Sequence, residues 1–147
     1  KIIAFKRSPM PAILKNVLAV VAGLIIGSVI NMGIIMVSGQ IIPPPSGADV
    51  TTVEGLKASM HLFTPVNFLF PFLAHALGTL AGSAVAARFA ATRRLIAALI
   101  VGLFFLAGGT AKVFMLPSPL WFTITDLGLA YLPMAYIGYK VSAPKES

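Results

Sequence analysis

The chain has 147 residues, of which 58% are hydrophobic and only 10% are charged, and its formal net charge is +7. Soluble domains carry roughly 25% charged residues, so this composition excludes a domain that faces water on all sides. The sequence contains no cysteine, which excludes disulfides, thiolate metal sites and cysteine nucleophiles.

The first predicted element is a membrane-spanning helix over residues about 12–37, because this run is apolar and long enough to cross a bilayer. It is too long and too rich in glycine for the core of a signal peptide, so we expect the mature protein to retain it. Since the chain begins with Lys1, we also expect residues to precede it in the full protein. Gly23 and Gly27 are spaced so that a second helix backbone can approach closely, which predicts helix packing there.

An outer loop over residues 38–65 is predicted next, because three consecutive prolines end the helix. Within this loop Thr51 and Glu54 match a capping box, with Thr51 as the N-cap. Apolar residues then recur at helical spacing. The sequence therefore predicts a short amphipathic helix at about 52–62 that lies along the membrane surface.

Three further apolar segments are long enough to span a bilayer, and a basic turn and a Pro-Ser-Pro turn separate them. In the first of these segments Gly78 and Gly82 belong to a stripe of small residues suited to helix packing. Pro133 lies inside the last segment, where a proline kinks a helix or frees a carbonyl group. The three predicted spans cover residues about 66–87, 95–116 and 120–139.

Together these elements predict an all-α fold. A single transmembrane domain, residues 1–147, forms a four-helix bundle with a short amphipathic surface helix in the first outer loop. Of the eleven Lys and Arg residues, all except Lys57 and Lys112 lie beside the N-terminus, the 88–94 turn or the C-terminus, which leaves nine on one side. Basic residues favour the cytoplasmic side, so we predict a multi-pass protein whose N- and C-termini are cytoplasmic.

Each predicted span contributes one residue to a candidate polar cluster in its outer half. Asp126 has a short side chain that cannot reach the interface, so it needs a partner, a proton or water. Lys112 either extends to the interface or pairs with Asp126 across adjacent helices. His75 and Asn31 fit hydrogen-bonded packing between helices, and His75 also fits a proton relay. The spacing leaves open whether this polar cluster, Asn31, His75, Lys112 and Asp126, is a structural clasp or a hydrated vestibule.

Several chemistries lack the residues they need. There is no glycine loop that could cradle a phosphate. Two histidines, no cysteine and few carboxylates disfavour a metal site, and no serine or threonine has a convincing His and Asp partner set. The basic residues flank apolar segments, so a nucleic-acid partner is not expected. We therefore predict no enzyme activity, no catalytic residue, no metal and no cofactor, and the sequence assigns no cofactor-binding residue.

Five short stretches are distinctive in content and order: 42–49 (IPPPSGAD), 56–58 (LKA), 75–78 (HALG), 86–88 (AAR) and 116–122 (LPSPLWF). They resemble a widespread group of small, uncharacterised bacterial four-helix membrane proteins, and the similarity extends from about residue 16 to residue 141. The proline-rich loop and the Pro-x-Pro-Leu-Trp-Phe turn are its more specific parts. The resemblance implies a bacterial inner-membrane protein of the same topology, and it implies no activity.

Two classes of function fit these features. The first is an accessory, assembly or stabilising subunit of a larger membrane complex, with the lipid bilayer and either other membrane subunits or copies of itself as partners. The alternative is a small oligomeric transporter or channel that uses the outward-facing polar cluster. Apart from Lys15 and the three tyrosines of the last span, the inner half of every span lacks ionisable residues, whereas a conduction path needs some polar lining throughout or a hydrophobic gate. The accessory role is therefore our first expectation.

Overall fold

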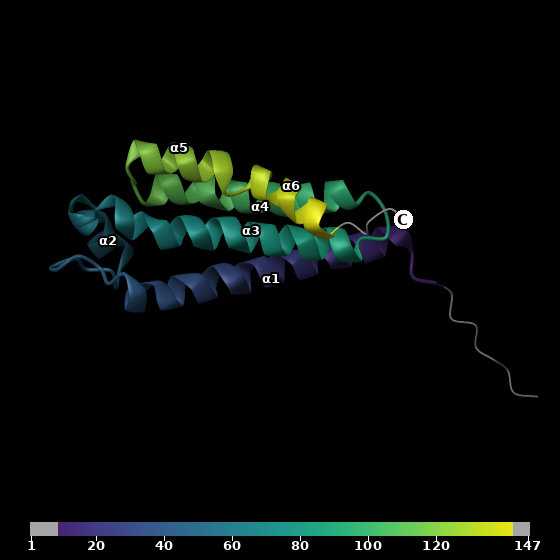
Figure 1. Ribbon diagram of the computed structural model, residues 1–147, viewed down its shortest axis with the longest axis horizontal. Coiled ribbons are helices and arrows are strands. Elements are labelled where there is room, and N and C mark those ends of the chain that lie inside the picture. Colours follow the sequence, from purple (N-terminus) through teal and green to yellow (C-terminus); the bar gives the residue numbers. More distant parts are fainter. Residues whose placement is uncertain (1–8, 143–147) are drawn as a thin grey trace, which may run out of the picture.

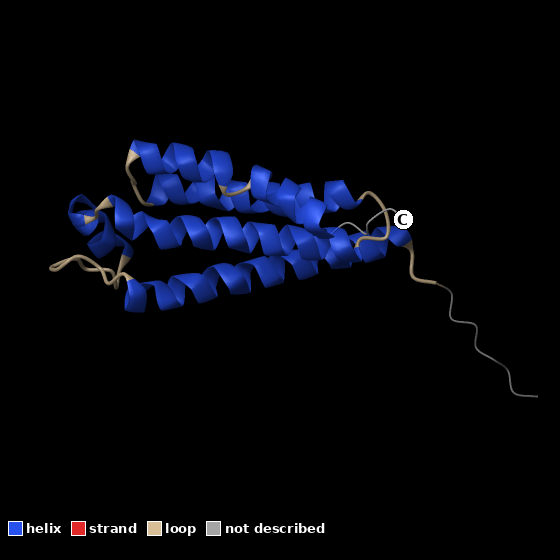
Figure 2. Cartoon of the chain, in the orientation of Figure 1, coloured by secondary structure: helices blue, strands red, loops and turns tan. Residues whose placement is uncertain are grey.

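The computed structural model describes residues 9–142, and every regular element in that part of the chain is helical (Figures 1 and 2). The short elements connect the first two long helices. Lys1, Lys6, Arg7 and Lys145, which entered the orientation prediction, lie outside the described residues. The elements are α1 (Ala12–Ile41), α2 (Val53–Ser59), η1 (Met60–Leu62), η2 (Pro65–Phe68), α3 (Leu69–Phe89), α4 (Arg94–Met115), α5 (Leu120–Leu129) and α6 (Leu132–Ser142), where η denotes a 3₁₀ turn.

Four helical segments are long and apolar enough to cross a membrane, which confirms the number of predicted candidate spans. The first continues four residues beyond the predicted end at position 37, because the chain stays helical until just before the proline run. The segments are Ala12–Ile41, Pro65–Phe89, Arg94–Met115 and Leu120–Ser142.

The last candidate span is interrupted at Ala130 and Tyr131, which separate α5 from α6. Pro133 has no N–H group, so it cannot donate to the carbonyl group four residues earlier. Around it the helical bonds run from the Ala130 N–H to the Asp126 carbonyl and from the Ala135 N–H to the Tyr131 carbonyl. The predicted kink at Pro133 is confirmed, and the break places Tyr131 beside the helix that carries Asp126.

The predicted short helix exists, but its N-cap was assigned wrongly. Thr52 is the N-cap, and its hydroxyl oxygen accepts a hydrogen bond from the Gly55 N–H at 2.9 Å. Both the N–H and the hydroxyl of Thr51 instead donate to Oδ1 of Asp49. An aspartate side chain readily bonds to groups two residues ahead in a turn, and this bond removes Thr51 from the capping role. The α-helix ends at Ser59, earlier than predicted, and the turn η1 follows.

The two ends of the molecule are distinguished by what connects the helices there. We call the end at which residues 9–11 and 90–93 lie the terminal end, and the end at which residues 42–68 and 116–119 lie the loop end (Figure 1). Between them α3 lies in the middle and packs against α1, α4 and α6. Helices α1 and α3 lie close together toward the terminal end and diverge toward the loop end (Figure 1).

Close backbone approach holds α1 against α3. A Cβ atom added at Gly82 would lie 2.5 Å from the carbonyl oxygen of Gly23, and one added at Gly78 would lie 2.8 Å from the carbonyl oxygen of Gly27. Glycine permits this approach because it has no side chain to separate the helices. The buried residues of α1 are Ala19, Gly23 and Gly27, which lie between its terminal end and its middle.

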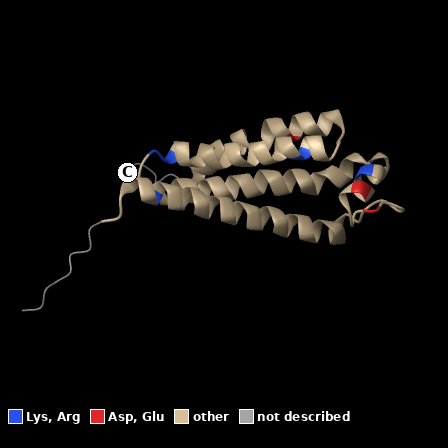
Figure 3. Cartoon of the chain, turned by 180° about the vertical axis from the view of Figure 1, so that it is seen from behind, with Lys and Arg blue, Asp and Glu red and all other residues tan. Residues whose placement is uncertain are grey.

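Charged side chains are concentrated at the two ends of the helices (Figure 3). The terminal end carries Lys and Arg, whereas the loop end carries both signs. Along the middle of the helices the view in Figure 3 shows neither kind of charge. A pair of opposite charges, Lys112 and Asp126, therefore stands out within the half of the helices toward the loop end.

Candidate functional site

The centre of the candidate site is a buried network of three side chains. Nδ1 of His75 lies 2.8 Å from Oδ1 and 2.9 Å from Oδ2 of Asp126. The Tyr131 hydroxyl donates to Oδ2 of the same carboxylate at 3.1 Å. All three residues are buried. An ionised carboxylate only accepts hydrogen bonds, so Nδ1 is the nitrogen of His75 that would donate to Asp126, and Nε2 is left for other contacts.

Three elements place this network. His75 comes from α3, Asp126 from α5 and Tyr131 from the break between α5 and α6. The rings of His75 and Tyr131 stack, with centroids 5.7 Å apart and planes 28° apart. Gly109 of α4 lies against the Tyr131 hydroxyl, where a Cβ atom would clash. The tyrosine can therefore reach Asp126 only because position 109 has no side chain.

Tyr131 was not among the predicted site residues. Read as part of one continuous helix, it was not recognised as a partner for Asp126. The available signal was Pro133, because the predicted kink shifts the residues just before it out of the regular helical spacing. The break just before Pro133 turns the phenol of Tyr131 toward the carboxylate of Asp126, five residues earlier.

Lys112 and Asn31 lie beside the network without joining it. Among residues 9–142 the one ion pair joins His75 and Asp126, so the alternative of an Asp126–Lys112 clasp is not the arrangement observed. Asn31 packs against Gly78: a Cβ atom added at Gly78 would lie 3.0 Å from the Cβ atom of Asn31. Within the same range the Asn31 side chain makes no hydrogen bond, so the interhelical bond expected of it is not formed.

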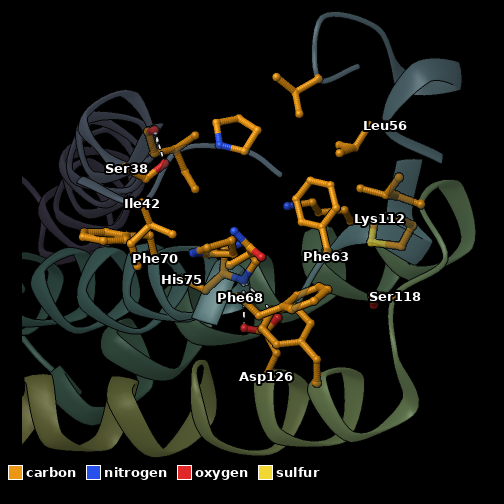
Figure 4. Close-up of a pocket in the computed structure, with 18 of the residues that line it drawn as sticks. Ser38, Ile42, Leu56, Phe63, Phe68, Phe70, His75, Lys112, Ser118 and Asp126 are labelled. Carbon is orange, nitrogen blue, oxygen red and sulfur yellow. Dashed lines mark hydrogen bonds and ion pairs between the residues drawn. The ribbon is translucent and has the colours of Figure 1, made fainter. Parts of the chain in front are cut away.

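A cavity of about 420 Å³, which we call the loop-end cavity, lies between the long helices where α1 has moved away from α3 (Figure 4). Leu56 and Met60, from α2 and η1, contribute to its wall, so the predicted surface helix covers a cavity. Most of the wall is apolar and includes several aromatic rings. The lining residues used below are Phe63, Phe68, His75, Lys112, Phe122 and Asp126.

A second cavity of about 360 Å³, the inter-helix cavity, lies between α1, α3 and α4. Asn31, Thr79 and Tyr131 contribute polar groups to its wall. The Thr79 hydroxyl is buried and has no hydrogen-bond partner among the residues the structure describes. His75 and Lys112 line both cavities, so the two spaces meet at these side chains.

An aromatic cluster joins the start of α3 to the start of α5. The ring centroids of Phe68 and Phe122 are 4.7 Å apart, and those of Phe68 and Trp121 are 5.6 Å apart in an edge-on arrangement. Aromatic pairs in such geometries add to the stabilisation from burial. This cluster fixes η2 against α5, and it places the chain's one tryptophan next to two residues of the cavity wall.

The site contains the hydrogen-bonded network of His75, Asp126 and Tyr131, the ammonium group of Lys112 and an apolar wall. Residues 9–142 contain no group of three or more side chains of the kinds that could hold a metal ion. Such a set of groups is suited to binding a molecule with one charged group and an apolar body. No protein-family model, curated protein or solved structure matches the chain, so the resemblance to a bacterial membrane family stays a prediction.

Proposed function

We propose that the chain is a bacterial inner-membrane protein in which four spanning helices form a bundle, with both termini in the cytoplasm. In this role it works without catalysis, as an accessory, assembly or stabilising subunit of a larger membrane complex. Four helical segments of sufficient length and apolar character support the spanning arrangement. The basic residues at the terminal end support the orientation.

One observation carries the accessory role over transport. From the terminal end to the middle of the helices, α1 and α3 are packed through glycine backbones, with Gly82 against Gly23 and Gly78 against Gly27. The loop-end cavity, in contrast, lies toward the loop end, and the inter-helix cavity reaches as far as Gly27 and Gly78 at the middle of the helices. A conduction path needs polar lining or a gate along its whole length. A single chain with space at only one end is better suited to binding and assembly than to conduction.

The first test is extraction from native membranes in a mild detergent, followed by native mass measurement of the particle that holds this chain. Co-migration with different, larger subunits is the expected result. A particle that contains only this chain would contradict the accessory role. The absence of cysteine also permits a test of the topology. A membrane-impermeant thiol reagent should label Ser46→Cys in intact cells and Ala91→Cys only after permeabilisation.

A small oligomeric transporter remains a second candidate, because the two cavities meet at His75 and Lys112. Several copies of the chain would have to complete a path past the closely packed terminal end. Reconstitution into liposomes tests this candidate. Solute flux that depends on His75 and Lys112 would favour transport, and an absence of flux with a homogeneous oligomer would remove it.

A further inference from the structure

We propose that the loop-end cavity binds an apolar carboxylate, a monoanionic amphiphile such as a medium-chain fatty acid. Its carboxylate would lie at Lys112, where the two cavities meet, and its hydrocarbon chain would occupy the loop-end cavity. The inference rests on the proposed membrane location, because the ligand partitions into lipid. It does not depend on the accessory role.

The charge argument begins with Lys112. Its ammonium group extends into the loop-end cavity (Figure 4). It makes no ion pair within residues 9–142, whereas the neighbouring Asp126 is paired. Lys112 lies beside apolar and aromatic wall residues, where a nearby counter-charge stabilises a cation. An anion in the cavity would supply that counter-charge.

Asp126 is already held by two other side chains. Nδ1 of His75 contacts both of its oxygens, and the Tyr131 hydroxyl donates to one of them. Both carboxylate oxygens are therefore already in contact with donors, whereas the Lys112 ammonium has no ion pair within residues 9–142. The ammonium group of Lys112 is a donor of the kind that carboxylates accept.

The rest of the wall favours a hydrocarbon chain, because most of its polar oxygens are already hydrogen-bonded. Oδ1 of Asn67 accepts from the N–H and the hydroxyl of Thr64. The hydroxyls of Ser118 and Thr123 are 3.0 Å apart and bond to each other. The Ser38 hydroxyl donates to the Ile35 carbonyl. What remains exposed to a ligand is mainly aliphatic and aromatic surface.

The size of the cavity fits one small amphiphile. A volume of about 420 Å³ falls within the roughly 300–1,000 Å³ typical of small-molecule sites. An aromatic wall with a few placed polar groups is also typical of such sites. The side chains that would contact the hydrocarbon chain of the ligand are Leu56, Met60, Phe63, Phe68 and Phe122.

Trp121 provides the readout, because it is the one tryptophan and packs against Phe68 and Phe122 of the cavity wall. Bromine quenches tryptophan fluorescence at short range. We would place the full chain in nanodiscs of zwitterionic lipid and titrate 12-bromododecanoate. The matched probe is 12-bromododecanol, which has the same chain and bromine but no charge. Unbrominated dodecanoate should reverse the quenching by competition.

We expect saturable quenching by the carboxylate at a concentration about ten-fold lower than by the alcohol, which corresponds to about 1.4 kcal/mol. Lys112→Met should raise the half-saturating concentration of the carboxylate to that of the alcohol. Lys112→Arg, which keeps the charge, should bind like the wild type. Lys57→Met is the matched control, because Lys57 is exposed on α2 and does not line the cavity.

Equal quenching by the two probes, or a failure of dodecanoate to compete, would overturn the proposal without any variant. So would unchanged carboxylate binding in a folded Lys112→Met protein. A preference for a brominated phosphatidylglycerol over the fatty acid would identify a lipid headgroup as the occupant and would also overturn it. The outcome is separate from the native mass measurement, so either proposal can fail while the other stands.

Discussion

The terminal end and the loop end of this molecule are built from different residues. At the terminal end the buried side chains are small, with Ala19, Ala86 and Ala97 in one apolar cluster. At the loop end the buried residues include Phe68, Phe122 and the charged Asp126. Small residues let helix backbones touch, whereas large rings and a polar network keep them apart. One end is therefore suited to holding helices together and the other to holding a ligand.

The divergence of α1 produces this difference. Its buried residues end at Gly27, and its remaining fourteen residues, 28–41, contribute to cavity walls or face outward. Gly33 and Gly39, which belong to this later part, have no atom within 4 Å of an added Cβ. Glycine alone therefore does not bring helices together. The opposing helix must also present a backbone at the same level, as α3 does with Gly78 and Gly82.

The largest expected effect is at the loop end. Asp126→Asn removes the charge that pairs with buried His75, and breaking a buried pair costs roughly 3–5 kcal/mol. We expect the free energy of unfolding in detergent to fall by about that amount, with no effect on liposome flux. Thr125→Ala on the same helix is the control and should change stability far less. Reduced flux at normal stability would instead assign Asp126 to a transport path.

The terminal end is tested by Gly23→Ala. The added methyl group meets the carbonyl oxygen of Gly82 and lies 3.0 Å from the Cβ of Ala86. Overpacking of this kind costs roughly 1–3 kcal/mol. Gly33→Ala on the same helix has open space and should be neutral or slightly stabilising. Thermal unfolding of the two variants gives the comparison, and equal midpoints would contradict the tight packing inferred at the terminal end.

A smaller difference in stability is expected between substitutions at two asparagines of α1. Oδ1 of Asn16 accepts from the N–H groups of Ala91 and Thr92, and its Nδ2 donates to the Thr92 hydroxyl. Asn16→Ala should cost about 1 kcal/mol and speed amide exchange at residues 91 and 92. Asn31→Ala should cost less, because Asn31 makes no such bond within residues 9–142. Hydrogen-exchange mass spectrometry of both variants is the measurement, and the reverse order would show that the loop end is held more tightly than its contacts indicate.

The smallest effect is a pH dependence in the loop-end connection. Hydrogen bonds from the Thr51 hydroxyl, and then from its N–H group, hold the pKa of Asp49 below its ordinary value of 3.8. A lowered folded pKa means that this local stabilisation is present above pH 3.8 and is lost as the pH falls through the folded pKa. Amide exchange at Thr51 should therefore quicken, relative to intrinsic rates, only as the pH falls through the folded pKa of Asp49. Asp49→Asn should remove the dependence, and a change near neutral pH would contradict it.

The candidate site was predicted in part. Asp126 was expected to need a partner, because its side chain is too short to leave an apolar span. His75 was expected to be buried and hydrogen-bonded, but the two were not assigned to each other. Depth along a helix can be counted from the sequence, whereas rotation about its axis depends on packing. Rotation decides that His75, and not Lys112, faces Asp126.

The sequence by itself determined the four long apolar helices, the break at Pro133 and the placement of basic residues, because each depends on local composition and backbone chemistry. Only the tertiary structure decided which glycines meet, where α1 leaves α3, and that Tyr131 completes the network on Asp126. Those outcomes depend on the relative rotation and tilt of helices. Rotation and tilt follow from the sum of many packing contacts between segments distant in sequence.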